Sequence, residues 1–381
     1  RFLMEIKNLI IFYPSFERGG VEKIIENLII YFSSKNINIF LITIKNKNLK
    51  KFNKVKNLQI ISPKNTSNIF FLPYRIFSMI KCLRSLVKLM KYLNNKNTVI
   101  HSMQSSFIPI LISKIKEFKI VIRNSEDPIS STKFSENRVW SYLIFIFRYF
   151  FYNFADMIIT NSKGSSISLK KFLISKNKSR VKYIYNPYLT IRKIKDSQIK
   201  RKRKNLIIGV GRLCKQKNFE HLILAFKKFL QKYDNFKLFI IGDGYQKNYL
   251  QKIINKEKLN KKVFLKGYRN NLNKYYKQAK LFVLPSIYEG LGNVLIDAIN
   301  YSVPCVSTTC KSGPSEILCN GKGGELAPIN NVELLNDKMI KSIRDKKITR
   351  RKLLFAKKNL NRFYHLNQAE KYFQALQSIL K

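Results

Sequence analysis

Two carboxylates, Glu289 and Asp297, lie eight positions apart in segment 285–299, on either side of a glycine-containing turn. The apolar run 281–285 before the turn is typical of a buried strand, and a helix is expected directly after Gly292. The first N–H groups of a helix have no partner within it, and the helix dipole favours negative charge there, so such a turn can bind a phosphate. Each carboxylate can then contact hydroxyl groups on one side of that phosphate, as in a sugar–diphosphate–ribose. The alternative is an ordinary strand–helix unit with a surface Glu and a helix-face Asp.

The segment 205–226 also runs from an apolar strand through a glycine turn into an amphipathic helix. Arg212 and Lys217 lie between the strand and the helix, beside Gly211. A planar guanidinium can bind a diphosphate through two parallel hydrogen bonds, and a mobile ammonium adds a second positive charge. The pair therefore fits a diphosphate site, although an Arg–Lys pair in so basic a chain also fits a solvated loop.

In both halves of the chain, apolar strand-like runs alternate with amphipathic helices, which predicts parallel sheets covered on both faces. The 381 residues, 45% of them hydrophobic, suit two domains. Ligands of such sheets bind beyond the carboxyl ends of the strands, so two facing sheets would place a site in the cleft between the domains. The expected strands are 9–13, 38–44, 58–62, 98–102, 119–123, 157–161 and 181–185, then 206–210, 237–242, 263–267, 281–285 and 304–308.

Five segments follow one another in the second half: VGRLCKQKN, IIGDGY, VFLKGY, PSIYEGLGNVLIDAI and PCVSTTCKSGPSEIL. They resemble the retaining glycosyltransferases of family 4, which have the GT-B fold. The resemblance covers most of the chain, is strong over 205–320 and is weaker over 40–200. It implies an α/β fold of two Rossmann-like, doubly wound domains that face each other across a cleft. The implied parts are an acceptor-binding domain, 1–189; a linker, 190–204; a nucleotide-sugar-binding domain, 205–360; and a final helix, 361–381, that crosses back to the first domain.

The resemblance implies that the protein is a retaining transferase of a hexose or N-acetylhexosamine. The donor would be a nucleotide-diphosphate sugar, in which UDP is the commoner nucleotide among similar enzymes. The acceptor would be a glycan or a lipid-linked precursor of surface polysaccharide. Arg212 and Lys217 would neutralise the departing diphosphate, and Glu289 would hold sugar hydroxyls. Asp297 would contact the ribose; it stands where the family usually has a second glutamate and is one methylene shorter. The residues implied in donor binding are Gly19, Gly20, Gly211, Tyr268, Gly290, Leu291, Gly292, Asn293, Val294 and Asp297.

His101 directly follows the apolar residues 98–100, near the carboxyl end of a predicted strand. Many members of the resembled family carry a functional histidine near this point, so we expect His101 to be a catalytic residue oriented toward the donor sugar. Arg123 and Glu126 end the next predicted strand, where they would either face the acceptor or cap a loop.

No metal or cofactor is expected. The five cysteines have no paired framework and no metal-ligand spacing to a histidine, and no Asp-x-Asp motif is present. The pattern predicts metal-independent chemistry in a cytoplasmic protein whose thiols are reduced. Three rival functions remain open: a non-hydrolysing sugar-nucleotide epimerase, a protein of the same fold that binds nucleotide sugar without turnover, and, prompted only by the charge, a nucleic-acid-binding protein.

The formal net charge is +51, from 73 Lys and Arg against 22 Asp and Glu. Such a charge favours a polyanionic partner, yet the basic residues are spread along the chain and no nucleic-acid-binding motif is present, so no nucleic acid is expected. One explanation is a base-composition bias toward AT, because Lys, Asn, Ile, Phe and Tyr are all abundant. The other is attraction to an anionic membrane surface.

Two segments bear on membrane contact. The aromatic segment 140–154, interrupted by Arg148, is too short to span a bilayer and fits either an interfacial helix or a helix buried in the first domain. The basic amphipathic segment 76–93 fits either membrane docking or a solvated helix face. A peripheral position on the inner face of the cell membrane is therefore expected if either segment binds lipid.

Overall fold

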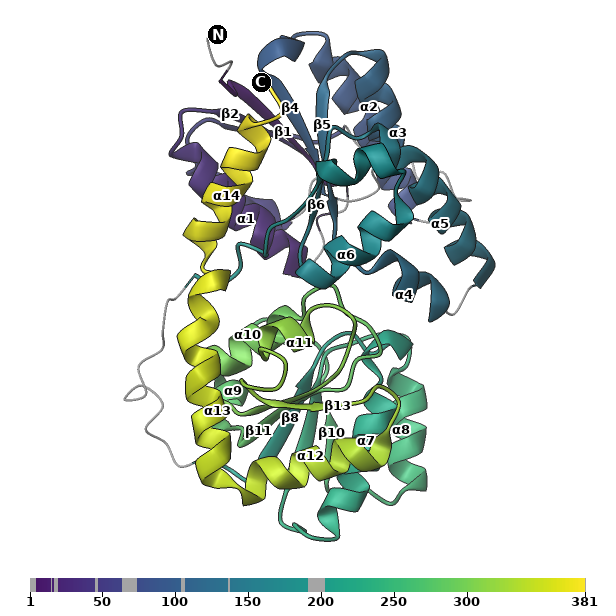
Figure 1. Cartoon of the computed structure of the whole chain (residues 1–381), viewed down its shortest axis with the longest axis vertical. Coiled ribbons are helices and arrows are strands. Elements are labelled where there is room, and N and C mark those ends of the chain that lie inside the picture. Colours follow the sequence, from purple (N-terminus) through teal and green to yellow (C-terminus); the bar gives the residue numbers. More distant parts are fainter. Residues whose placement is uncertain are drawn as a thin grey trace.

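The computed structural model describes residues 5–14, 16, 20–44, 47–63, 74–103, 107–135, 138–190 and 203–380. Two domains are stacked along the long axis of the molecule, each with a parallel sheet between layers of helices (Figure 1). The chain thus has the predicted α/β architecture of two Rossmann-like domains. The predicted linker 190–204 lies mostly outside the described residues.

The first domain contains a seven-stranded sheet in the order β3-β2-β1-β4-β5-β6-β7, and its neighbouring strands are all parallel. The chain order reverses between β1 and β4, which is where doubly wound sheets leave a crevice for ligands. The strands are β1 (Asn8–Phe12), β2 (Asn38–Ile42), β3 (Leu58–Ile61), β4 (Thr98–Ser102), β5 (Lys119–Asn124), β6 (Met157–Thr160) and β7 (Val181–Tyr183).

The second domain contains a six-stranded parallel sheet in the order β10-β9-β8-β11-β12-β13. Its last strand, β13 (Glu325–Ala327), was not predicted, because it has only three residues and begins with a charged one. The other strands are β8 (Leu206–Val210), β9 (Lys237–Ile241), β10 (Val263–Leu265), β11 (Leu281–Leu284) and β12 (Cys305–Thr308).

Helices connect these strands in both domains. In the first domain they are α1 (Gly20–Ser33), α2 (Tyr74–Met90), α3 (Phe107–Ile115), α4 (Pro128–Lys133), α5 (Arg138–Phe151) and α6 (Lys163–Phe172). In the second they are α7 (Phe219–Leu230), α8 (Lys247–Lys256), α9 (Asn273–Gln278), α10 (Asn293–Asn300), α11 (Pro314–Ile317), α12 (Val332–Arg344) and α13 (Lys346–Lys358).

The last helix, α14 (His365–Gln377), returns to the first domain and packs beside α1 (Figure 1). Tyr372 and Leu376 belong to the buried core of that domain, and the Gln377 side chain accepts a 3.1 Å hydrogen bond from the backbone N–H of Ile6. The first domain is therefore completed by residues from both ends of the chain.

The two segments considered for membrane contact behave differently. Cys82 and Leu86 of α2 are fully buried in the core of the first domain, so the apolar face of this helix is used internally, while Arg84 and Lys88 are exposed. Helix α5, in contrast, lies on the surface, and none of its 14 residues, all of them described, is buried. Of the two alternatives for segment 140–154, the buried helix is therefore wrong for α5, and only Tyr152, just after this helix, is buried in the core.

Candidate active site

The N-termini of two helices, one from each domain, meet across the cleft. Helix α10 begins after Gly292, whose φ of 90° lies in the left-handed region, and no described side chain caps its first amides. Helix α1 begins at Gly20, where an added Cβ would lie 3.5 Å from the Asn293 side chain. The positive ends of both helix dipoles thus point into one space, which favours a bound anion.

A hollow lies between the domains at this point. The first domain lines it with Gly20, Val21, Met103, Arg123, Glu126, Arg148, Tyr152 and Asn186, and the second with Arg212, Gln216, Lys217 and residues 289–294, among others. Among the described residues, three guanidinium groups and one ammonium group border the space that both helix N-termini face, and the carboxylates of Glu22, Glu126 and Glu289 border it as well. This concentration of positive charge suits a ligand that carries more than one negative charge.

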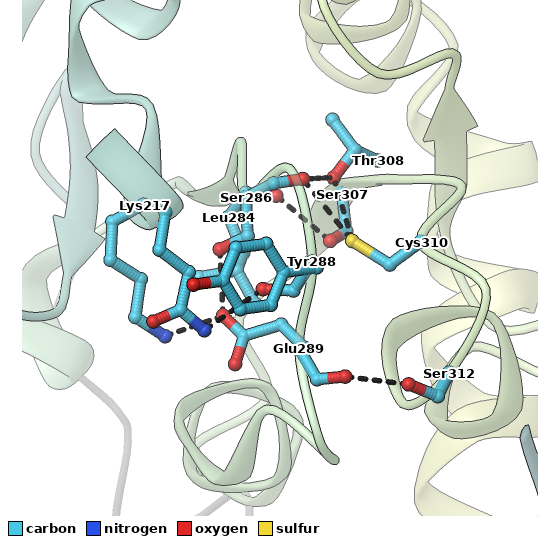
Figure 2. A network of polar contacts seen from close by, with 10 residues as sticks. Lys217, Leu284, Ser286, Tyr288, Glu289, Ser307, Thr308, Cys310 and Ser312 are labelled. Carbon is cyan, nitrogen blue, oxygen red and sulfur yellow. Dashed lines mark hydrogen bonds and ion pairs between the residues drawn. The ribbon is translucent and has the colours of Figure 1, made fainter. Parts of the chain in front are cut away.

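Lys217 and Glu289 form a partly buried ion pair at one side of the hollow (Figure 2). The Ser286 hydroxyl donates a 2.6 Å hydrogen bond to the same carboxylate oxygen, Oε1 of Glu289, and Ser312 holds the backbone carbonyl of Glu289 at 2.5 Å. The carboxylate is therefore held by two side chains, and the backbone of the same residue is held by a third. A ligand at this point would meet a rigid Glu289 rather than a mobile surface side chain.

The loop that carries Lys217 is tied to the loop that carries Glu289. The backbone N–H of Ile287 donates to the Gln216 carbonyl at 2.9 Å, and the Gln216 side chain donates to the Tyr288 carbonyl at 3.0 Å. At Gly211, an added Cβ would lie 3.2 Å from the Lys217 side chain. The glycine therefore leaves room for the lysine stem, and the two predicted basic residues belong to one braced turn.

Glycine is also required where the domains touch. A Cβ on Gly290 would lie 1.8 Å from the backbone oxygen of Ser125 in the first domain, a distance no real side chain can reach. Beside this contact, the Asn161 side chain donates a 3.0 Å hydrogen bond to the same Ser125 oxygen. Gly290 therefore permits close approach of the domains, whatever else it contacts.

The carboxylate of Glu316 makes a second contact between the domains. Its two oxygens accept hydrogen bonds from the backbone N–H groups of Lys163, at 2.9 Å, and Gly164, at 2.7 Å, which open helix α6. An acidic side chain at a helix N-terminus is favourable because it satisfies free amides and opposes the helix dipole. The second domain thus supplies a cap to a helix of the first.

A chain of polar side chains crosses the cleft beside α10. Buried Arg123 donates a 2.7 Å hydrogen bond to the Asn186 side-chain oxygen, and the Asn186 amide donates at 2.9 Å to the Asn293 side-chain oxygen. Arg123 and Glu126, considered from the sequence as acceptor-facing or loop-capping residues, both line the hollow. Asn186 was missed because nothing in its aromatic and apolar segment, YIYNPYL, marks it as a site residue.

Asp297 lies one helical turn beyond Asn293 and does not border the same hollow. It is partly buried, and Tyr188 donates a 2.6 Å hydrogen bond to its Oδ2. It faces a neighbouring hollow lined also by Lys23 and Asn273. Burial raises the pKa of Asp297, while Lys23 and the hydrogen bond from Tyr188 lower it. Glu289 and Asp297 therefore border different hollows, and Tyr188 is a partner of Asp297 that the sequence analysis did not name.

His101 lies within the predicted strand 98–102, which the structure contains as β4. It is the penultimate residue of β4, is completely buried, and is not among the described residues that line the hollow. Its Nδ1 is 3.3 Å from the Val121 carbonyl oxygen, and its ring packs edge-on against Tyr372. Burial lowers the pKa of His101 to about 4. The residue just beyond β4 that borders the hollow is Met103.

The other residues predicted to form the site do not all lie at the hollow. Arg212 is exposed and borders the hollow. Tyr268 follows β10, is half-exposed and is outside the set of described residues that line the hollow. Gly19 lies outside the described residues. Arg148, on α5, borders the hollow although the sequence analysis used it only as an interruption of an apolar segment.

Two negative findings apply to the described part of the chain. It has no group of three or more His, Cys, Asp or Glu side chains arranged to hold a metal ion. Searching the same residues finds no helix that is both long and apolar enough to cross a membrane.

The second half of the chain matches a known protein family. Residues 190–359 match the family model of glycosyl transferases group 1. An uncharacterised glycosyltransferase of Methanocaldococcus jannaschii is 35% identical over 230 residues, which are 56% of this chain and 55% of that protein. The chain therefore contains a glycosyltransferase group 1 domain.

A second relative has a more specific name. It is the N-acetylgalactosamine-N,N'-diacetylbacillosaminyl-diphospho-undecaprenol 4-alpha-N-acetylgalactosaminyltransferase of Campylobacter jejuni, 34% identical over 210 residues, which are 52% of this chain and 56% of that protein. The chain spans little more than half the length of these two relatives.

Solved structures resemble the whole chain. A crystal structure of TarM covers 99% of this chain and all of its own, with a TM-score of 0.78 and 16% identity. Anabaena HepE, solved with UDP and glucose, covers 98% of this chain and all of its own, with a TM-score of 0.76 and 16% identity. At this level of identity the likeness shows the fold, which is GT-B.

Proposed function

We propose that this protein is a glycosyltransferase that moves a hexose or N-acetylhexosamine from a UDP-sugar to a glycan or lipid-linked acceptor in surface polysaccharide biosynthesis. The observation that carries the proposal is the meeting of the α1 and α10 N-termini at a hollow that Arg212 and Lys217 also border. The group 1 domain and the name of the Campylobacter jejuni relative support the same reaction class.

In the proposed reaction, the bond between the anomeric carbon and the diphosphate oxygen breaks, and a bond from that carbon to an acceptor hydroxyl oxygen forms. Arg212, Lys217 and the first amides of α10 would stabilise the negative charge that develops on the departing diphosphate. The acceptor proton would pass to an oxygen of that diphosphate. Glu289 would hold sugar hydroxyls, and Asp297 would contact the ribose from the far side of the α10 N-terminus.

We propose that the sugar keeps its anomeric configuration. The names of three relatives, from Campylobacter jejuni, Staphylococcus aureus and Bacillus subtilis, specify α-linked transfer, and UDP-hexoses are α-linked donors. NMR of the product's anomeric proton tests this: an α-linked product supports retention, and a β-linked product contradicts it.

The reaction is also proposed to need no metal, because basic side chains border the space assigned to the diphosphate. Turnover that is unchanged in excess EDTA supports this proposal. Loss of turnover in EDTA, restored by added Mg²⁺ or Mn²⁺, contradicts it.

A thermal-shift panel with UDP, GDP, ADP and their common sugar conjugates tests the donor. A ligand that binds only the folded state adds RT ln(1 + [L]/Kd) to the free energy of unfolding, about 2.7 kcal/mol at a hundredfold excess over Kd. A selective shift with UDP-sugars supports the proposal, and no shift with any nucleotide contradicts it. A modified donor formed without acceptor would indicate an epimerase, and binding without turnover would indicate a protein that has lost catalysis.

A further inference from the structure

Helix α5 exposes an apolar surface that a helix of a globular protein normally buries. Val139 is 71% exposed, Trp140 63% and Phe150 59%. The helix lies at the outer side of the first domain (Figure 1). Large apolar side chains thus face solvent along its length, and contiguous exposed apolar patches mark interaction sites.

The neighbouring helix α3 extends this surface. The two helices pack together, with the Phe107 and Phe147 rings 5.9 Å apart between their centroids. On α3, Leu111 is 50% exposed and Ile115 is 69% exposed. We call the exposed apolar residues of both helices the α3–α5 surface.

Exposed basic residues lie on the helices beside the α3–α5 surface, and one exposed carboxylate, Glu117, follows α3. The sequences of α2, α3, α4 and α5 contain no Asp or Glu. Arg84 and Lys88 are exposed on α2, which contacts α3, and Arg138 is exposed at the start of α5. An apolar surface bordered by cations matches a layer of lipid tails bordered by anionic headgroups.

We propose that the α3–α5 surface docks on an anionic lipid bilayer, with the α5 axis lying in the headgroup region. At 14 residues, α5 is about 21 Å long at 1.5 Å per residue, too short to cross a hydrocarbon core of about 30 Å. Its Trp and Tyr residues are the types that accumulate at membrane–water interfaces. A second copy of the chain fits less well, because a two-fold contact through this surface would bring like charges together.

The position of Arg148 connects this surface with the candidate active site. Arg148 belongs to α5 and borders the hollow between the domains, so docking through α5 holds the hollow close to the headgroups. The suggestion that docking brings the hollow to a lipid-linked acceptor rests on the proposed function. The docking of the α3–α5 surface on a bilayer does not.

The test uses Trp140, which is the only tryptophan in the chain. The purified protein is titrated with phosphatidylcholine vesicles that contain or lack phosphatidylglycerol, without nucleotide, while Trp140 emission and vesicle flotation are recorded. We expect a blue shift of the emission, protection from acrylamide quenching, and co-flotation only with the anionic vesicles. An unchanged emission with no co-flotation overturns the proposal, and so does equal binding to both kinds of vesicle.

Two variants separate the apolar and the charged contributions. Phe150→Ser is expected to weaken vesicle binding about tenfold or more, whereas Leu354→Ser, at a comparably exposed site on α13, leaves it unchanged. The double variant R84E/K88E keeps the apolar surface and is expected to lose the preference for anionic vesicles. Because it changes only exposed side chains of α2, it remains informative if Phe150→Ser fails to fold.

Self-association has a distinct outcome in the same experiment. A blue shift without vesicles that grows with protein concentration, and that Phe150→Ser abolishes, would assign the α3–α5 surface to a second copy and overturn the proposal. Donor thermal shifts are measured separately without lipid. If the protein does not bind vesicles but UDP still raises its melting temperature, only the docking proposal is overturned. If it binds anionic vesicles but no nucleotide raises its melting temperature, only the proposed function is overturned.

Discussion

The Tyr188 hydroxyl donates a 2.6 Å hydrogen bond to Oδ2 of Asp297, which joins the segment between the domains to the helix that faces the cleft. Lys23 of α1 lies 3.9 Å above the centre of the Tyr188 ring. A carboxylate, a phenol and an ammonium from three separate segments thus form one cluster. A ribose bound by Asp297 would have to share this carboxylate with the tyrosine.

Tyr188→Phe is expected to lower the free energy of unfolding by about 1.5–3 kcal/mol, because a partly buried carboxylate loses its hydrogen bond from a buried tyrosine. Urea denaturation at pH 7 measures the change. Tyr183→Phe serves as the control, since Tyr183 is half-exposed, and should change stability by less than about 0.5 kcal/mol. Equal effects of the two variants would show that the hydrogen bond contributes nothing specific.

Asp297→Asn is expected to weaken donor binding, because an amide is a weaker acceptor than a carboxylate for ribose hydroxyls. Calorimetric titration with the nucleotide identified in the thermal-shift panel measures this. Asp337→Asn, on the remote helix α12, is the matched control. An unchanged affinity in Asp297→Asn would detach this residue from the ribose.

Arg212→Ala is expected to reduce turnover about a hundredfold or more, as for the loss of one group that stabilises developing charge. The nearby Lys215 is exposed and is not among the described residues that line the hollow, so Lys215→Ala should retain turnover. Steady-state kinetics of both variants with the same donor provide the comparison. Wild-type turnover in Arg212→Ala would remove its proposed role.

Gly290→Ala is expected to separate the domains, because the new Cβ would collide with the Ser125 carbonyl. We expect a larger radius of gyration by small-angle X-ray scattering and about a hundredfold lower turnover, since small displacements of reacting groups have effects of this size. Gly267→Ala is the control: its added Cβ meets open space, although its φ of 65° adds strain. An unchanged radius and turnover in Gly290→Ala would contradict the contact.

His101 should make stability depend on pH in a predictable direction. Its pKa is lowered to about 4 by burial, so the unfolded chain binds a proton more readily than the folded one. The free energy of unfolding is then expected to fall as pH decreases from about 6.5 to 4, by up to about 3 kcal/mol. Denaturation at pH 7 and pH 5 should show a smaller decrease in His101→Phe than in the wild type. Equal decreases would exclude His101 as the source.

Much of the architecture could be predicted because apolar strands and helix-forming turns leave local signals. Strand β4 matches its predicted range, and the glycine turn before α10 indicated where amides would be free. The depth of a side chain along its strand was less predictable: His101 is buried within β4, whereas Met103, two residues further along the chain, borders the hollow. Tyr188 and Arg148 were missed because their partners lie on other segments, and only tertiary packing brings these residues together.

The return of α14 to the first domain has a consequence for synthesis. Tyr372 and Leu376 complete the core that begins with β1, whereas the sheet of the second domain lies entirely between residues 206 and 327. During translation the core of the first domain therefore stays incomplete, with part of its apolar surface exposed, until α14 has left the ribosome. The part that is made second is the first that can finish folding.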